Sequence, residues 1–145
     1  MIDTNRWILP TALALLAACG GPSDVLPDAQ PGPSVSVVGD TAFLELPLGR
    51  SADNGEISVT FDAVTEDSRC PADVQCVWEG NGAIRLTLTG ADETEVVILN
   101  STLDPRQASF GPYTIGFRDL TPYPVSDEPT DRGEYVARIA IVDTR

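Results

Sequence analysis

Apolar and polar residues alternate along several stretches of this chain. Four stretches carry apolar residues at every second position: 57–63, 84–88, 113–117 and 135–141. A period of two places successive side chains on opposite faces of an extended chain, so each stretch predicts a β-strand with one buried face. Two weaker strands are predicted at 41–48 and 95–100. No stretch shows the apolar i, i+3, i+4 spacing of an amphipathic helix over three turns.

Glycine-containing turns separate consecutive predicted strands. Asn54-Gly55 and Gly90-Ala91-Asp92 are expected to supply the positive φ angles of tight hairpins. Short strands joined by turns, without alternating helices, indicate an all-β fold. We therefore expect residues 40–145 to form a small antiparallel β-sandwich or barrel of about six to eight strands.

The N-terminal segment has the organisation of an export signal. Arg6 ends a short polar segment, and residues 7–18 form an apolar run of 12 residues, shorter than the roughly 20 that span a bilayer. The run ends in Leu16-Ala17-Ala18-Cys19-Gly20, which resembles the bacterial lipobox. The resemblance implies that residues 1–18 are a lipoprotein signal peptide and that Cys19 carries the lipid, including palmitate. The alternative is an ordinary secretory peptide with a chance cysteine.

The lipobox resemblance also implies a location. The expected anchor is the N-terminal lipid in the membrane of a bacterial cell envelope, since two or three acyl chains hold a protein firmly. In a Gram-negative source, Gly20 in place of Asp favours the outer membrane, with the domain in the periplasm.

A segment rich in proline and glycine follows the lipobox. Residues 19–39 show almost no periodic apolar pattern and are interpreted as a linker. The alternative is an ordered arm in which three valines add an edge strand to the domain: Val35, Val37 and Val38.

Composition narrows the possible chemistry. The 145 residues include 22 acidic and 9 basic side chains, all nine of them arginine, with no histidine and a net charge of −13. This composition excludes histidine-based triads, histidine metal ligands and lysine Schiff bases. The acidic balance argues against nucleic acid as a partner, because phosphate would be repelled. We expect no cofactor and no enzyme, since only carboxylates remain for catalysis and nothing in the sequence pairs two of them.

Cys70 and Cys76 are the two cysteines that the predicted lipid leaves over. Thiols oxidise in an export compartment, so we expect a disulfide that closes a seven-residue loop. A redox-labile pair is an alternative. A zinc site is not expected, because two thiolates without histidine leave it two ligands short.

An acidic stretch, 127–134, is the other candidate for metal binding. Its carboxylates are those of calcium ligands in type, but their spacing is not that of an EF-hand and no glycine lies where its turn requires one. We interpret the stretch as a solvated loop. Its acidic residues are Asp127, Glu128, Asp131 and Glu134.

The segment around the cysteines also holds candidate binding residues. Arg69, Trp78 and Glu79 are candidates for a presenting patch at the rim of the sheet, since Arg and Trp are enriched at binding hot spots. We favour the structural interpretation, in which Asp67 and Arg69 pair with each other or cap loop amides, and Trp78 buries its ring. We expect Trp78 to be at least half buried, with Arg69 and Glu79 at the rim carrying any recognition.

The same segment resembles a known signature. The string Asp67-Ser68-Arg69-Cys70-Pro71, followed by Cys76-Val77-Trp78 and Gly80, is similar to that of an uncharacterised family of small bacterial lipoproteins and secreted proteins. Looser matches extend the resemblance over about residues 41–143: Tyr113-Thr114-Ile115, Leu120 to Pro124, and Tyr135. The resemblance implies a small all-β domain and no catalytic residues.

Two functions fit these observations. The first is a lipid-anchored, non-enzymatic interaction or structural module of the cell envelope, with the membrane and a protein as partners. The second is an inhibitor of a basic secreted hydrolase, a lysozyme or a protease. The acidic charge supports the second function because it would steer the domain toward a cationic protein.

Replacing Cys19 by Ser tests the predicted anchor. The variant is expected to lose acylation and to stay soluble or unprocessed, because the lipid is attached through the thiol. Detergent partitioning and gel mobility measure both outcomes. A Cys19→Ser protein that still enters detergent and migrates like the mature wild type would exclude the lipoprotein interpretation.

Overall fold

The computed structural model describes residues 31–145. The predicted signal peptide at 1–18, the lipidation of Cys19 and the first part of the predicted linker lie outside the described residues. No helix of the described part is long and apolar enough to cross a membrane.

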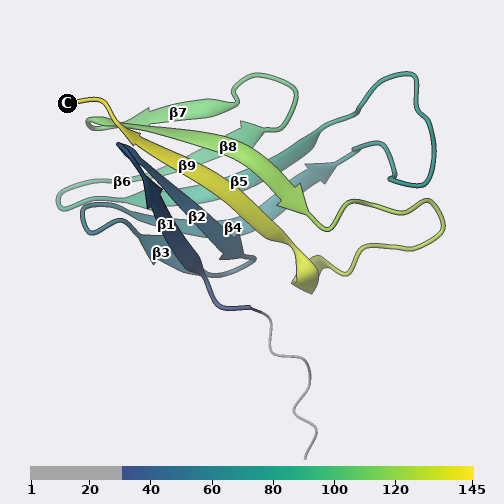
Figure 1. Cartoon of the computed structure of the whole chain (residues 1–145), viewed down its shortest axis with the longest axis horizontal. Helices are drawn as coiled ribbons and strands as arrows, with labels where there is room; N and C mark the ends of the chain where they lie inside the picture. The colour runs from purple at the N-terminus through teal and green to yellow at the C-terminus, as the bar shows by residue number, and fades with distance from the viewer. Residues whose placement is uncertain (1–30) are drawn as a thin grey trace, which may run out of the picture.

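Within the described residues, nine antiparallel strands form two sheets that pack face to face (Figure 1). The first sheet has the order β1 (Ser34–Val38), β2 (Thr41–Pro47), β9 (Val136–Asp143), β8 (Tyr113–Thr121) and β7 (Gln107–Phe110). The second has the order β3 (Ser51–Asp53), β4 (Ser58–Asp67), β5 (Gly82–Thr89) and β6 (Thr94–Asn100). A 3-10 turn, η1 (Arg132–Glu134), precedes β9. The predicted all-β fold is confirmed, and it is a sandwich.

The predicted strands correspond to β2, β4, β5, β6, β8 and β9. The three additional strands lie at sheet edges: β1, β3 and β7. β1 is the edge strand that the valines of 35–38 offered as an alternative, so the sandwich begins at Ser34 and not at residue 40. β3 and β7 have only three and four residues, too few to show a period of two.

Alternation places one face of each central strand in a common core. In β5, Ile84, Leu86 and Leu88 are fully buried while Arg85 and Thr89 face solvent. The core has both sheets as its walls, as expected for two apolar faces that exclude water from each other. Its largest fully buried side chains include Phe61, Leu44, Leu46, Leu99, Ile115, Leu120, Ile139 and Ile141.

The two predicted hairpin turns differ in backbone conformation. Gly55 has a φ of 96°, as a turn between β3 and β4 requires. Gly90 does not have a positive φ; its amide instead donates to the Glu93 carbonyl at 2.9 Å and closes the β5–β6 turn. The prediction of a positive φ was therefore right at Gly55 and wrong at Gly90.

Two long loops meet at one end of the sandwich. The first, residues 68–81, joins β4 to β5, and the second, residues 122–135, joins β8 to β9 (Figure 1). The chain enters β1 at this same end, because Ser34 pairs with Glu45 near the end of β2, next to the start of β9. We call this the loop end of the sandwich.

Candidate functional site

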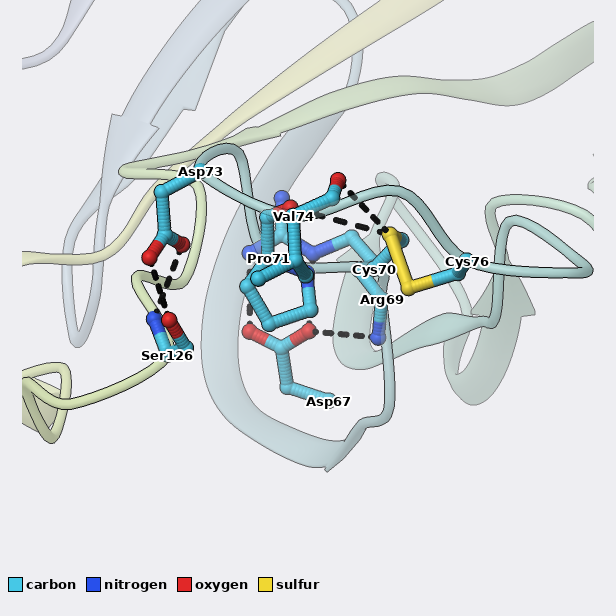
Figure 2. The surroundings of a disulfide bond; sticks show 8 residues. All are labelled: Asp67, Arg69, Cys70, Pro71, Asp73, Val74, Cys76 and Ser126. Atoms are coloured by element: carbon cyan, nitrogen blue, oxygen red, sulfur yellow. Dashed lines mark hydrogen bonds and ion pairs between the residues drawn. A yellow bond between two sulfur atoms is a disulfide. The ribbon is translucent and has the colours of Figure 1, made fainter.

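A disulfide closes the β4–β5 loop. Cys70 and Cys76 are bonded, with their Cα atoms 6.0 Å apart (Figure 2). The predicted pairing is therefore confirmed. The Cys70 amide donates to the Glu79 carbonyl at 2.9 Å, so the closed loop continues the antiparallel approach of the two chain segments beneath it.

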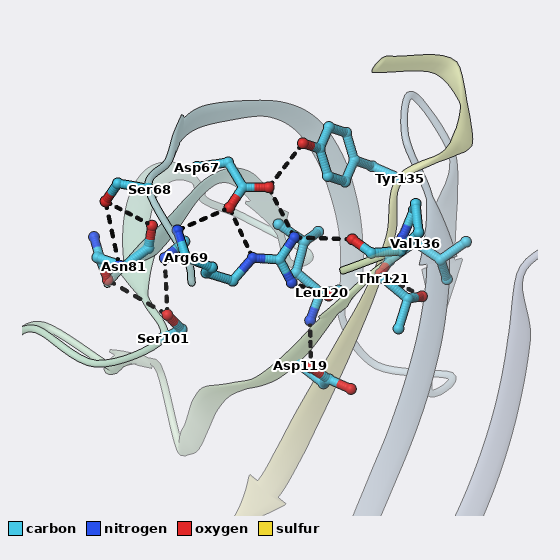
Figure 3. Close-up of polar contacts among 12 residues, drawn as sticks. Asp67, Ser68, Arg69, Asn81, Ser101, Asp119, Leu120, Thr121, Tyr135 and Val136 are labelled. Carbon is cyan, nitrogen blue, oxygen red and sulfur yellow. Dashed lines mark hydrogen bonds and ion pairs between the residues drawn. The ribbon is translucent and has the colours of Figure 1, made fainter. Parts of the chain in front are cut away.

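Arg69 lies beneath the loop and not at its rim. Its side chain is 5 % exposed, and its guanidinium grips Asp67 with two parallel bonds, from Nε to Oδ1 and from Nη2 to Oδ2, each 2.8 Å long (Figure 3). Nη2 also donates to the Pro122 carbonyl at 2.9 Å, and Nη1 donates to the Leu120 carbonyl. The predicted rim position of Arg69 is wrong, because these acceptors lie in the interior.

The pair of Arg69 and Asp67 joins the two sheets. Asp67 ends β4 in one sheet, whereas Leu120 belongs to β8 in the other. Tyr135, just before β9, donates its hydroxyl to Asp67 Oδ2 at 2.8 Å. The structural interpretation, in which Asp67 and Arg69 pair with each other, is confirmed.

Charge and hydrogen bonding keep the pair ionised. Burial alone would raise the pKa of Asp67, but the hydrogen bonds from Arg69 and Tyr135 and the positive charge of Arg69 bring it below its ordinary value. Burial and the bond to Asp67 raise the pKa of Tyr135, so its phenol keeps the proton that it donates. With both carboxylate oxygens accepting bonds, Asp67 is not available as a general base or metal ligand.

A second set of contacts fixes the base of the loop. Ser68 donates its amide to the Asn81 carbonyl at 2.8 Å, and buried Asn81 donates its side-chain amide to Asn100 Oδ1 at 2.9 Å. Gly80 has a φ of 72°, and a Cβ there would lie 1.9 Å from the Ser68 carbonyl oxygen. No sequence pattern singles out Asn81, and Gly80 stands out only as part of the signature.

A third set of contacts ties the two long loops together. The Asp73 carboxylate accepts from the Ser126 amide at 2.9 Å and from its hydroxyl (Figure 2). The Ala72 amide donates to the Pro124 carbonyl at 2.9 Å. Arg69 also lies over the ring of Tyr123, 4.7 Å from the ring centre, in a cation–π contact. Contacts therefore hold the β4–β5 loop at three places: at its base through Ser68 and Asn81, at its side through Asp73, and in the interior through Arg69.

The outer part of this loop is exposed and carries three apolar side chains, Val74, Val77 and Trp78. We call residues 74–79 the loop tip. Trp78 is 62 % exposed, Val77 is fully exposed, and Val74 and Glu79 also face solvent. The prediction that Trp78 is at least half buried is wrong, because residues 70–81 form no strand and a two-residue period does not determine which side chains face inward there.

The acidic residues of the β8–β9 loop belong to no metal centre in the part of the chain that the structure describes. The side chains of Asp127, Glu128, Asp131 and Glu134 are exposed. Asp131 accepts from the Gly133 amide at 3.0 Å and thereby caps η1. Across residues 31–145, no three His, Cys, Asp or Glu side chains lie together in a way that could hold a metal ion. An open hollow of about 480 Å³ lies beside the Arg69–Asp67 pair. Its lining includes Glu66, Asp67, Glu128 and Tyr135.

Asp67→Asn tests the role of the buried pair. The variant leaves the Arg69 charge without its partner and is expected to lose about 3–5 kcal/mol of unfolding free energy. The pKa of Asp67 is lower in the folded protein than its ordinary value, so the contribution of the pair to the unfolding free energy is complete above the ordinary carboxyl pKa of about 3.9. That contribution is lost as the pH falls through the lower pKa of the folded state. Urea unfolding from neutral to acidic pH measures both effects.

The matched control is Asp92→Asn, which removes an exposed carboxylate in the β5–β6 turn. It should change the unfolding free energy by less than about 0.5 kcal/mol. Equal losses in the two variants would contradict the structural role of Asp67.

Gly80→Ala tests the close approach at the base of the loop. Gly49 has a similar φ of 75° but open space around it, so Gly49→Ala measures the backbone cost alone, about 1–2 kcal/mol. Gly80→Ala is expected to cost clearly more, because its Cβ meets the Ser68 backbone. Thermal unfolding compares the two variants, and equal melting temperatures would show that the base of the loop yields without penalty.

Comparison with known proteins adds no functional information to this geometry. No protein-family model, no curated protein sequence and no solved structure matches the chain. The resemblance of the segment around Cys70 and Cys76 to a bacterial lipoprotein signature therefore stays a prediction.

Proposed function

We propose that this protein is a lipid-anchored, non-enzymatic interaction module of the bacterial cell envelope that contacts a protein partner through its loop tip. One observation carries the proposal: Trp78 and Val77 are exposed on a loop that is fixed from below. A soluble domain gains nothing for its own stability from a tryptophan held in water. An exposed tryptophan on a rigid support is the usual form of a binding anchor.

Rigidity strengthens this interpretation. Ordering a flexible loop on binding costs conformational entropy, which reduces affinity. Here the disulfide, the Arg69–Asp67 pair and the Asp73–Ser126 bonds order the loop before any partner arrives. The loop tip therefore presents its apolar side chains at low entropic cost.

The charge around the loop tip supports a basic partner. Glu79 follows Trp78 directly and is exposed, and Arg69 is already paired with Asp67. The whole chain carries a net charge of −13, which would steer a cationic protein toward it. Further exposed carboxylates lie on the segments that flank or face the loop: Glu66, Asp127 and Glu128.

These features also support inhibition of a basic secreted hydrolase as a second candidate function. A rigid, disulfide-closed loop with an apolar tip has the form of a segment that fills an enzyme cleft, and the acidic surroundings suit a basic lysozyme or protease. Assays of such enzymes with and without the protein distinguish the two functions. Inhibition that Trp78→Ala abolishes would favour the inhibitor.

The location of the module rests on the lipobox resemblance at 16–20. We place the protein on a membrane of the cell envelope, and on the outer membrane if the source is Gram-negative. Fractionation of cells that express the full chain tests this placement independently of any binding experiment.

Trp78→Ala tests the binding role of the loop tip. Tagged full-length protein, captured from detergent-solubilised envelope, is expected to retain a basic protein that Trp78→Ala loses. Removing a hot-spot anchor costs at least about 2 kcal/mol, a loss of roughly thirtyfold in affinity or more. Rising salt should release the partner, because screening weakens the attraction between opposite charges.

The matched control for this experiment is Ile98→Ala, which removes an exposed apolar side chain on β6. Capture should be unchanged in this variant. If both variants retain the same partner as the wild type, Trp78 is not the anchor and the loop tip is not the contact surface.

A further inference from the structure

Within residues 31–145, β1 is an edge strand that pairs on one side only. It pairs with β2 over all five of its residues, from Ser34 opposite Glu45 to Val38 opposite Thr41. No strand among residues 31–145 pairs with its other side. Figure 1 shows β1 at the border of the first sheet, next to β2. Its outward backbone amides and carbonyls are therefore a template for another strand.

β1 lacks the features that usually protect a sheet edge. Natural edges carry charged side chains, prolines or bulges, which discourage pairing with another chain. β1 reads Ser-Val-Ser-Val-Val and contains none of these, although the chain has a net charge of −13. Val37 and Val38 are each 67 % exposed, and Val35 is also exposed.

The facing sheet leaves part of this edge uncovered. Val35 and Val37 share a face with Leu44 and Ala42, their partners on β2, whose side chains point into the core. The nearest strand of the other sheet, β3, has only three residues. Val35 and Val37 therefore extend the apolar inner face of the first sheet beyond the part that the second sheet covers.

We propose that β1 pairs in an antiparallel manner with β1 of a second copy of this chain, about a twofold axis at Ser36. The pairing joins the two first sheets into one continuous sheet across the dimer. It uses neither the loop tip nor the lipid anchor, so it does not depend on the proposed function.

Symmetry and strand length determine the register. A twofold axis perpendicular to an antiparallel pair places a residue opposite its own copy, and only such registers keep like faces together. Centring the axis on Ser36 lets all five residues of β1 overlap. Val35 of one copy then lies opposite Val37 of the other, on the inner face. The pair brings valine against valine and no charge against charge.

The chain that precedes β1 is a poor competitor for this edge. Pro27, Pro31 and Pro33 lack backbone amides and cannot donate to a β-ladder at those positions. A second copy of the chain matches the alternation of β1 by symmetry, because the same strand contributes both sides of the contact. These arguments favour self-pairing over the other possible occupants.

The dimer is expected to be reversible. Five residues per copy form a small contact, and interfaces below about 1,200 Å² in total belong to weak or transient complexes. Two copies of charge −13 also repel each other, so added salt is expected to favour the dimer by screening. Binding of a basic partner at the loop tip has the opposite salt dependence, which separates the two proposals experimentally.

Cysteine cross-linking in the full-length chain tests the proposed register. In Ser36→Cys the new thiol lies opposite its own copy, at a cross-strand Cβ separation of about 4.5–5.5 Å, and mild oxidation is expected to give a disulfide-linked dimer. Ser109→Cys is the matched control: Ser109 is also an exposed serine on an edge strand of the same sheet, at its opposite border. The wild-type chain shows the background linkage without an added cysteine.

Val35→Cys and Val37→Cys define the register further. Each variant alone is expected to cross-link weakly, and an equal mixture of the two is expected to cross-link strongly, since 35 faces 37 across the axis. Accidental collision would link all three samples alike. Strong linkage of either variant alone would place the axis elsewhere and overturn the Ser36 register.

Sedimentation of the full-length chain in detergent provides a readout that needs no cysteine. The wild type is expected to shift toward the dimer as concentration and salt rise, and Ser36→Lys is expected to remain monomeric, since two lysines then face each other. Ser109→Lys controls for the added charge, and thermal melting confirms that both variants fold. Ser36→Cys linkage no greater than that of Ser109→Cys, a monomer at all concentrations, or linkage of Ser36→Cys to a different protein would overturn the proposal.

Discussion

The buried ion pair between Arg69 and Asp67 is the interaction on which the loop end of this molecule depends. A guanidinium out of water is tolerated only when its donors are satisfied, and here carboxylate and carbonyl oxygens from both sheets accept from it. The pair therefore does more than neutralise charge. It fixes how the end of β4 lies against the end of β8, and with them the starting points of both long loops.

This arrangement gives the two ends of the segment 67–78 different structural roles. Asp67 and Arg69 are turned inward and belong to the support, whereas Val77 and Trp78 are turned outward on the far side of the disulfide. Gly80 lets the chain return close against Ser68. One contiguous segment thus supplies both a rigid base and an apolar tip, and the residues that were grouped as one patch have different roles.

The sequence predicted the positions of side chains in regular strands but not in irregular loops. Alternation predicted β4, β5, β8 and β9, because in a ladder the side-chain face follows from position. The disulfide followed from the number of cysteines. The burial of Arg69 depends on carbonyls of Leu120 and Pro122, more than fifty residues away, which no local pattern reveals. The exposure of Trp78 was missed because an irregular loop has no faces to alternate.

The entry of the chain into β1 at the loop end has a consequence for access. The fourteen residues 20–33 reach at most about 50 Å when fully extended. If Cys19 is held at a bilayer, this attachment keeps the start of β1, and the loop end beside it, within about that distance of the lipid surface. A target resident in the same membrane then reaches Trp78 at shorter range than one diffusing freely. Attachment through Cys19 would therefore favour partners in the same membrane over soluble partners of equal affinity.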